Sequence, residues 1–384
     1  MKVTGDWLTD PASQSVCAAL TGAGFAAYFV GGCVRNALLD APVSDIDIST
    51  DARPEKVMEL ARAAGFHAVP TGIDHGTVTV VAKGVAHEVT TFRKDIETDG
   101  RRAVVAFADS IEEDARRRDF TMNALYATPA GDVVDPVGGL ADLNARKIRF
   151  IDDAGARIRE DYLRTLRFFR FNAWYGRDKG GFDREALAAI ADTLDGLDTL
   201  SRERVGAEMI KLLSAPDPAR ALAAMEKCGV LLRLLPGADS RSIGPLVYVE
   251  DETGIKADPI LRLAALGGED VAKRLRLSKA QTRELAFFRA EVGSATPPHE
   301  IGYRFGAELS EKLLVLRAAM LQEHVDRKAF AAMEDGANAV FPIKAADLMP
   351  RYEGQALGDK LRALEMLWIA SGFTLGRDDL LTDD

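Results

Sequence analysis

The stretch YFVGGCVRNALLDAPVSDIDIST, residues 28–50, decides the fold of the N-terminal part of the chain. Its first run is apolar and β-branched, the segment after Gly31 and Gly32 has helical spacing, and DIDIST alternates as a strand does. We therefore expect strand, glycine turn, helix and strand in succession. Glycines at such a turn let backbone amides approach an anion, and Arg35 lies one turn into the helix.

Two acidic residues share one side of the second expected strand. Successive side chains of a strand point to opposite faces, so Asp45 and Asp47 point together while Ile46 and Ile48 pack on the other face. Two close carboxylates raise one another's pKa unless a cation lies between them, which favours a hard ion such as Mg²⁺. The competing interpretation is an exposed strand face that carries two acids by chance.

The rest of the first 150 residues mixes strand and helix patterns. Strands are expected at 76–84 and 87–92, and helices at 12–24, 54–65 and 112–127. Glu88 on the second of these strands could complete an acidic set for two-metal phosphoryl transfer, unless it is simply an edge-strand acid. We predict an α+β region that ends near residue 150.

Arginine is concentrated in the middle of an otherwise acidic protein. The net charge of −10 argues mildly against a nucleic-acid partner, yet Arg117 and Arg118 stand in a run of three arginines that could bind phosphates. Solvated helix faces are the alternative. The helix expected at 112–127 opens with Ser110 and Glu113 at capping-box spacing, and it places Asp119 and Asn123 on one face, suited to a ribose hydroxyl and a phosphate.

Beyond residue 150 strand signals nearly vanish. In the first of the expected helices, Asp161, Arg164 and Arg167 lie on one face. An acid and an arginine placed in this way can hydrogen-bond the edge of a base. The alternative is an ion pair on the surface with no functional role. The expected helices cover residues 158–175, 183–194, 201–214, 217–234, 257–267, 278–292, 307–323, 326–335 and 357–371.

Composition narrows the class of protein. No run of about 18 apolar residues occurs, and the polar N-terminus lacks a signal-peptide pattern, so we expect neither a membrane nor a secreted protein. Three scattered cysteines fit reduced thiols in a cytoplasmic chain. The five histidines include no adjacent His-Asp pair, and we therefore expect no phosphohydrolase activity of that type.

An ordered set of segments resembles the class II CCA-adding enzymes, the tRNA nucleotidyltransferases of the poly(A) polymerase family. These segments are VGGCVRN with SDIDIST, TGIDHGTVTV, HEVTTFR, RRRDFTMNALY, DPVGGLADL, REDYLRTLRFFRF and SRERVGAEMIKLL. The resemblance implies an α+β nucleotidyltransferase head like that of the polymerase β superfamily at 1–150. It further implies an all-α neck with a nucleotide-selecting helix at 151–215, and a body and tail that bind tRNA at 216–384.

The same resemblance assigns roles to individual residues. It implies that Asp45 and Asp47 hold two Mg²⁺ ions. It also implies that nucleotides from CTP and ATP are added to the acceptor end of a tRNA, and that the protein binds this tRNA at its elbow as well. The triphosphate would be contacted by Gly31, Gly32 and Arg35. The ribose and phosphates would be contacted by Arg117, Arg118, Asp119 and Asn123. The base would be contacted by Glu160, Asp161 and Arg164, with Arg167 in support.

Two positions depart from the family pattern, and rival functions stay open. Asn36 stands where the family usually has aspartate, and Asp40 where glycine is common. The rivals are a poly(A) polymerase, an enzyme specialised for A or for CC, and a non-catalytic RNA-binding protein. Segment 90–110 resembles the flexible loop with which full CCA-adding enzymes switch from C to A, and this favours the complete activity.

Overall fold

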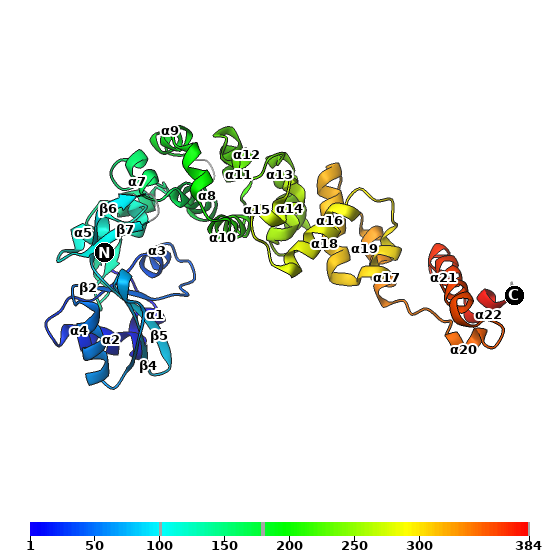
Figure 1. Ribbon diagram of the computed structural model, residues 1–384, viewed down its shortest axis with the longest axis horizontal. Coiled ribbons are helices and arrows are strands. Elements are labelled where there is room, and N and C mark those ends of the chain that lie inside the picture. Colours follow the sequence, from blue (N-terminus) through cyan, green and yellow to red (C-terminus); the bar gives the residue numbers. More distant parts are fainter. Residues whose placement is uncertain (100–101, 178–180, 383–384) are drawn as a thin grey trace. The chain divides into compact units, whose positions relative to one another are not determined.

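The computed structural model describes residues 1–99, 102–177 and 181–382 (Figure 1). The chain forms two compact units, Met1–Leu212 with Ala224–Leu234, and Leu213–Ala223 with Leu235–Asp384. The three domains expected at 1–150, 151–215 and 216–384 stay a prediction, because the division into compact units places no boundary at residue 150.

A mixed sheet forms the core of the first unit. Within the described residues its strand order is β3-β4-β5-β2-β1-β8-β9, and β2 runs parallel to β5 while the other neighbours are antiparallel. The strands are β1 Tyr28–Val30, β2 Asp47–Thr50, β3 His67–Gly72, β4 Thr77–Ala82, β5 Val85–Thr91, β8 Tyr126–Ala127 and β9 Val133–Val134. All four strands expected from the sequence are present, and β1 and β2 flank a glycine turn and a helix as expected.

A separate antiparallel pair, β6 Arg93–Asp99 and β7 Arg102–Phe107, occupies most of the segment compared above with a flexible loop. Residues 100 and 101 of that segment lie outside the described residues. The base of the pair is tied to the rest of the unit, because the backbone N–H of Arg93 donates to Asp114 Oδ1 at 3.2 Å.

Helices pack against the sheet and follow it along the chain. They are α1 Asp6–Thr9, α2 Pro11–Thr21, α3 Gly32–Leu38, α4 Pro54–Ala63, α5 Ile111–Arg116, α6 Gly139–Asn144, α7 Ala154–Glu160, α8 Leu163–Tyr175, α9 Arg184–Asp192, α10 Arg202–Leu213, α11 Ala219–Lys227 and α12 Val230–Leu234. Short 3₁₀ turns lie at η1 Ile73–His75, η2 Thr121–Asn123 and η3 Leu194–Thr199.

The single helix expected at 112–127 was wrong. Helix α5 starts after the predicted cap, with Ser110 accepting from the N–H of Glu113, but it ends at Arg116. Phe120 then adopts extended backbone (φ −121°, ψ 146°) and is fully buried, with its ring 4.9 Å from that of Phe150. A continuous helix would lose this packing, so the chain leaves the helix to bury the ring.

The helix expected at 158–175 is also interrupted. Asp161 has extended backbone (φ −154°, ψ 105°) between α7 and α8, and its carboxylate accepts from the N–H of Leu163 at 3.1 Å. The Asp161 carboxylate therefore caps the first turn of α8, and the helix does not continue from α7 into α8. The segment 217–234 divides similarly, into α11 and α12.

The regular elements of the second unit, within its described residues, are helices joined by loops. Its remaining elements are η4 Ser240–Ser242, α13 Ile243–Thr253, α14 Pro259–Leu266, α15 Val271–Arg274, α16 Lys279–Glu291, α17 Pro298–Phe305, α18 Ala307–Leu321, α19 Arg327–Asn338, α20 Ala345–Leu348, α21 Gly354–Ala370 and α22 Arg377–Leu381. Helices α13 and α17 were not expected. Pro245 obscured the first of them, although proline is tolerated in the first turn of a helix.

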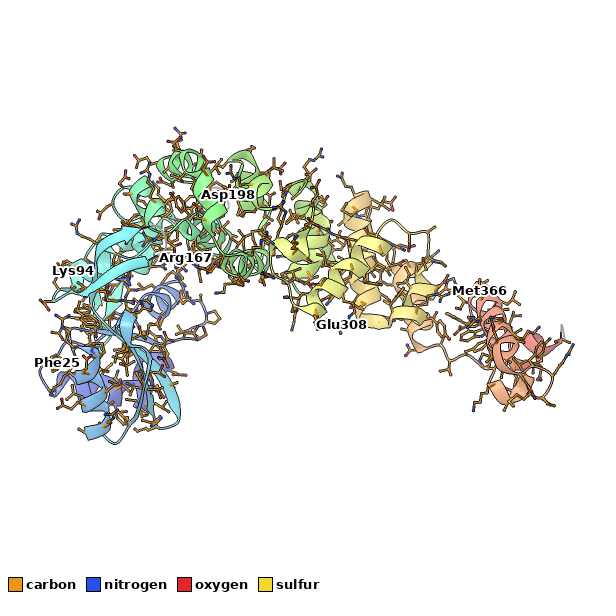
Figure 2. All side chains as sticks on the ribbon, viewed as in Figure 1. Phe25, Lys94, Arg167, Asp198, Glu308 and Met366 are labelled. Carbon is orange, nitrogen blue, oxygen red and sulfur yellow. The ribbon has the colours of Figure 1, made fainter. Side chains whose placement is uncertain are left out.

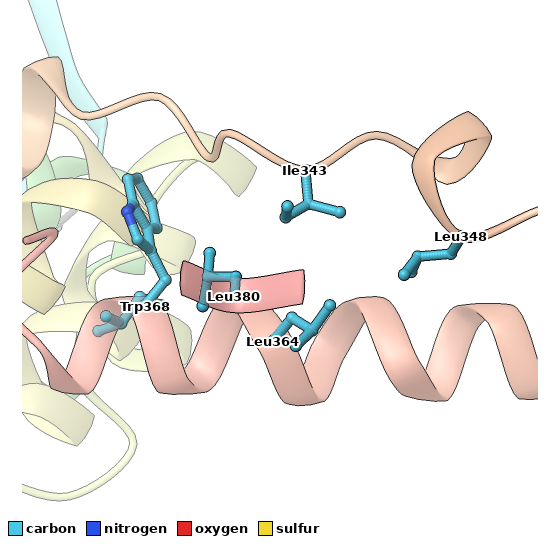
Figure 3. Packing of buried hydrophobic residues seen from close by; sticks show 6 residues of the cluster. Ile343, Leu348, Leu364, Trp368 and Leu380 are labelled. Atoms are coloured by element: carbon cyan, nitrogen blue, oxygen red, sulfur yellow. The ribbon is translucent and has the colours of Figure 1, made fainter. Parts of the chain in front are cut away.

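Two buried features stabilise this unit. The Arg262 side chain, 1% exposed, pairs with Glu250 and donates to the carbonyl oxygens of Leu213 at 2.7 Å and Pro216 at 3.1 Å. Near the C-terminus, Ile343, Leu348, Leu364, Trp368, Ile369 and Leu380 form a hydrophobic cluster (Figure 3). Among residues 1–99, 102–177 and 181–382, no helix has the length and apolar character needed to span a membrane.

Candidate active site

A pocket of about 390 Å³ in the first unit collects most of the residues singled out from the sequence. Eleven of the fourteen predicted site residues line it, whereas Asp45, Glu88 and Glu160 do not. The lining consists of Gly31, Gly32, Arg35, Asp47, Arg117, Arg118, Asp119, Asn123, Asp161, Leu163, Arg164, Arg167, Phe171 and Arg204. Six arginines against three aspartates give these side chains a net charge of +3 at neutral pH, which suits a polyanionic ligand.

The glycine turn forms one wall of the pocket. Gly31 has a positive φ of 72°, and its N–H donates to the carbonyl oxygen of Leu125 at 3.0 Å. A Cβ at this position would also contact Arg118 Nη1 at 3.4 Å. Both the backbone conformation and the close approach of this arginine therefore favour glycine.

The acidic residues lie at the start of β2 and beside it. Asp47 is half-buried and opposes Glu88 in the parallel register of β2 and β5. Asp45 is exposed and precedes the strand, which begins at Asp47 and not at residue 45 as expected; its carboxylate accepts from Ser44 Oγ at 3.1 Å. Burial raises the pKa of Asp47, Glu88 and Asp45 raise it further, and Arg118 partly opposes the shift.

These carboxylates fit a magnesium ion by their chemistry. Mg²⁺ is held in proteins by one or two carboxylates together with phosphate oxygens and water, and a cation would relieve the repulsion that raises the pKa of Asp47. Among the residues that the structure describes, no three acidic, histidine or cysteine side chains form a preassembled metal site.

Arg118 is fixed by a buried network that sequence reasoning missed. Its guanidinium donates to Asp114 Oδ2 at 3.0 Å and to the hydroxyl of Tyr126 at 3.1 Å, and that hydroxyl donates to Asp114 at 2.7 Å. Burial would raise the pKa of Asp114, but Arg118 and Arg117 outweigh it and lower the pKa. The spacing of four residues between Asp114 and Arg118 was the available sequence signal.

Asp119 and Asn123 lie together although no long helix carries them. Asn123 Nδ2 donates to Asp119 Oδ1 at 2.9 Å through the turn η2, and Arg167 Nε on α8 donates to Asp119 Oδ2 at 2.6 Å. Burial would raise the pKa of Asp119, but the ion pair with Arg167 and the hydrogen bonds lower it. Figure 2 labels Arg167 in this part of the first unit.

Asp161 and Arg164 both line the pocket, and the backbone N–H of Arg164 donates to the carbonyl oxygen of Asp161 at 2.9 Å, but their side chains bond to other partners. Arg164 Nη1 donates to Glu160 at 2.5 Å and to the carbonyl oxygen of Arg157 at 2.9 Å. Asp161 accepts from Arg204 Nη2 at 2.7 Å. Arg204 was missed, because 43 residues separate it from Asp161 and no local pattern marks such a pair.

Two family models match the chain. The poly(A) polymerase head domain matches residues 27–149, and the domain described as "Probable RNA and SrmB- binding site of polymerase A" matches residues 181–241.

The curated relatives are named as CCA-adding enzymes or as a CCA tRNA nucleotidyltransferase. The CCA-adding enzyme of Geobacillus thermodenitrificans is 43% identical over 216 residues, which is 56% of this chain and 52% of the relative, so the matched part spans about half of that relative's length. The mitochondrial CCA tRNA nucleotidyltransferase 1 of Mus musculus is 32% identical over 371 residues, which is 92% of this chain and 85% of the relative.

Solved structures agree with these relatives. The Bacillus stearothermophilus CCA-adding enzyme in complex with CTP has a TM-score of 0.72 and 30% identity, with coverage of 94% of this chain and 92% of that one. The Thermotoga maritima CCA-adding enzyme complexed with tRNA_CCA has a TM-score of 0.73 at 19% identity, with coverage of 100% and 98%, and it shows the shared fold alone. The long match to the mouse enzyme, together with the head domain, shows that the chain belongs to the CCA-adding enzymes, the tRNA nucleotidyltransferases related to poly(A) polymerases.

Proposed function

We propose that this protein adds C, C and A to the 3′ end of tRNA from CTP and ATP, without a nucleic-acid template and with release of pyrophosphate. The observation that carries the proposal is the pocket of the first unit, whose lining has a net charge of +3 and includes Asp47, Asp161 and Arg164. Such a pocket can hold a triphosphate and a base edge at the same time. The three free cysteines fit a cytoplasmic site of action.

The triphosphate would lie against the glycine turn. There the backbone of Gly31 and Gly32 can approach closely, and Arg35 and Arg118 supply positive charge. Asp119 and Asn123, held to one another and to Arg167, would meet the ribose hydroxyls and orient the sugar.

The base edge would lie against Asp161 and Arg164. Arg164 keeps Glu160 and two carbonyl oxygens as partners, those of Arg157 and Arg117, so its guanidinium is held in one orientation. Asp161 pairs with Arg204, and the side chain of Asp161 is itself 31% exposed, so it can still accept from a base. A donor and an acceptor fixed in this way would discriminate between bases as a template base does.

Asp45 and Asp47, with Glu88 beside them, would hold two Mg²⁺ ions. When bound, these ions lower the pKa of the attacking hydroxyl and neutralise charge on the triphosphate. In the proposed reaction the 3′-hydroxyl oxygen of the tRNA bonds to the α-phosphorus and the bond to the pyrophosphate oxygen breaks. The residues around the pocket orient the nucleotide for this in-line displacement.

The RNA would be held by the helical part of the chain, at its acceptor end and elbow. The match of residues 181–241 to a domain described as a probable RNA-binding site supports this assignment. Backbone contacts with RNA depend on where positive charge lies and not on a fixed motif, which fits the weak sequence pattern beyond residue 215.

Three tRNA transcripts test the proposal, ending at the discriminator base, at the first C and at the second C. Each is incubated with the protein, CTP, ATP and Mg²⁺, and the products are sequenced. We expect every transcript to be completed to CCA and then to stop. Extension of the third transcript alone would identify an A-adding enzyme. Extension by C alone would identify a CC-adding enzyme, and a long A tract would identify a poly(A) polymerase. Binding of tRNA without any extension would show a non-catalytic RNA-binding protein.

A further inference from the structure

Tyr162 lies between Asp161 and Arg164, the two residues proposed to meet the base, but it does not line the pocket. Asp161, Leu163 and Arg164 are all lining residues, whereas Tyr162 is not one of them. It is half-buried, and it precedes the first turn of α8 with helical backbone angles (φ −60°, ψ −16°). Its side chain therefore makes its contacts elsewhere in the first unit.

The ring of Tyr162 packs on the backbone of Gly196. This glycine belongs to the turn η3, and α8 and α9 separate it from Tyr162 along the chain. A Cβ added at Gly196 would lie 1.9 Å from Cε1, 2.1 Å from Cδ1 and 2.2 Å from Cζ of the ring. Carbon atoms in contact lie about 3.5 to 4.0 Å apart, so any side chain at position 196 would collide with the ring. The backbone of Gly196 has no positive φ, and the ring is therefore the obstacle to alanine at this position.

The turn η3 gives the ring a fixed surface to pack on. The N–H of Gly196 donates to the carbonyl oxygen of Thr193 at 3.1 Å, and the carbonyl oxygen of Gly196 accepts from Thr199 Oγ1 at 2.7 Å. Leu197, the next residue, is buried. Both backbone polar groups of Gly196 are thus bonded within the turn, and the adjacent leucine anchors the turn in the core.

Tyr162 connects this surface to the residues that would meet the base. The carbonyl oxygen of Asp161 accepts from the N–H of Arg164 at 2.9 Å, and the carbonyl oxygen of Tyr162 accepts from the N–H of Thr165 at 3.1 Å. These residues therefore form one turn at the start of α8. Because Tyr162 is part of that turn, the packing of its ring determines the direction in which the side chains of Asp161 and Arg164 leave it.

We propose that Tyr162 and Gly196 are positioning residues for base selection, and that the ring packed on the glycine fixes the turn that carries Asp161 and Arg164. The inference rests on the proposed function, since the base is that of CTP or ATP. Neither Tyr162 nor Gly196 lines the pocket, so both act through the turn. Gly196 lies within residues 181–241, so the contact links the segment matched by the RNA-binding domain to the choice of nucleotide.

One added methyl group tests this inference. In Gly196→Ala the ring has to move by about 1.5 Å or more to restore van der Waals separation. Tyr162→Ala removes the ring, and Tyr162→Phe keeps it. The double variant Tyr162→Ala/Gly196→Ala carries the methyl group without the ring that it would collide with. Gly181→Ala is the matched control, because it lies in the same unit and its added Cβ would have no atom within 4 Å.

Selectivity is measured as the ratio of kcat/KM values, for CTP over UTP on a tRNA ending at the discriminator base and for ATP over GTP on a tRNA ending at the second C. Calorimetry gives the Kd of CTP and of UTP with Mg²⁺ in the absence of tRNA. Thermal unfolding of each variant reports whether it is folded.

For Gly196→Ala we expect both selectivity ratios to fall about tenfold, because a displacement of about 1 Å in a group that orients a substrate can cost more than this. For Tyr162→Ala we expect a fall of about threefold, since Asp161 keeps its hydrogen bond to the N–H of Leu163. The double variant should match Tyr162→Ala, so that removal of the ring rescues part of the loss caused by the methyl group. Tyr162→Phe and Gly181→Ala should match the wild type.

Two results would overturn the positioning role. The first is a Gly196→Ala variant that keeps wild-type ratios, or whose loss is unchanged when the ring is removed. The second is an equal fall in activity with all four nucleotides, because the contact would then stabilise the fold without affecting selection. Should Gly196→Ala not fold, the comparison of Tyr162→Ala with Tyr162→Phe decides, and equal ratios in these two variants would refute the inference.

The calorimetry separates this inference from the proposed function. If the wild type binds CTP in preference to UTP and Gly196→Ala removes that preference, yet no tRNA is extended, the inference holds and the proposed function fails. If the wild type completes tRNA and the variants select nucleotides as it does, the proposed function holds and the inference fails.

Discussion

Replacing Asp47 by asparagine should stabilise the metal-free protein and at the same time abolish nucleotide transfer. The carboxylate is half-buried and opposes Glu88 across two parallel strands, which lie about 4.8 Å apart. Two unit charges at about 5 Å repel by about 1 kcal/mol in water and by about 3 kcal/mol at the effective dielectric near a protein surface. Arg118 offsets part of this repulsion, so we expect a net gain of about 1 kcal/mol for the variant.

The pH dependence follows from the raised pKa of Asp47. A carboxyl whose pKa is higher in the folded state favours folding while it is protonated, and this contribution is lost as the pH rises through the folded pKa. The wild type should therefore lose stability relative to Asp47→Asn as the pH rises from about 4 through the folded pKa of Asp47.

Thermal unfolding in EDTA measures the first effect, and extension of tRNA measures the second. We expect the unfolding midpoint of Asp47→Asn to rise by about 2 °C at pH 7.5 and turnover to fall by about a thousandfold or more. Asp6→Asn is the control, because it removes the same charge at an exposed position in the same unit and should change stability by less than about 0.5 kcal/mol. A variant that is less stable than wild type in EDTA, or that keeps normal turnover, would refute the reasoning.

Three further predictions concern other parts of the chain. Arg164→Ala should lose about 1 to 3 kcal/mol of discrimination between nucleotides, measured as the ratio of kcat/KM values for CTP, ATP, GTP and UTP; unchanged ratios would contradict the role in base selection. Glu250→Ala should destabilise the second unit by about 3 to 5 kcal/mol in urea unfolding, because it leaves Arg262 buried without its counter-charge, and a loss below about 1 kcal/mol would refute this. The pKa of Asp119 is lowered, so its stabilisation is present above about pH 4 and is lost as the pH falls through the folded pKa; Asp119→Asn should unfold with a weaker acid dependence than wild type, and an equal dependence would contradict the pairing.

Local sequence patterns predicted the elements of this fold better than their ends. The glycine turn between β1 and α3 was predicted, because Gly31 follows an apolar run and precedes a helical pattern. The end of α5 was not predicted, because it depends on the burial of Phe120 against Phe150, thirty residues further along the chain. The interruption at Asp161 likewise depends on a side chain that accepts from the backbone of Leu163, and helical periodicity does not report such a bond.

The candidate site was predictable where its parts are close in sequence. Asp45 and Asp47 could be placed near one another from their spacing alone. The register of Asp47 with Glu88 joins strands that are distant in sequence, and the pair of Asp161 with Arg204 joins two helical segments, so neither follows from a local pattern. The hydrogen-bond partners of Arg35 show the same limit, since Asn36 is adjacent in sequence but Tyr175 lies 140 residues away.

The position of a bound nucleotide tests the central claim most directly. Crystals of the protein soaked with CTP and Mg²⁺ should show the triphosphate against Gly31, Gly32 and Arg35, with the edge of the cytosine on Asp161 and Arg164 and metal beside Asp47. A nucleotide bound outside this pocket, or one whose base lies at the glycine turn with no ion near Asp47, would contradict the account.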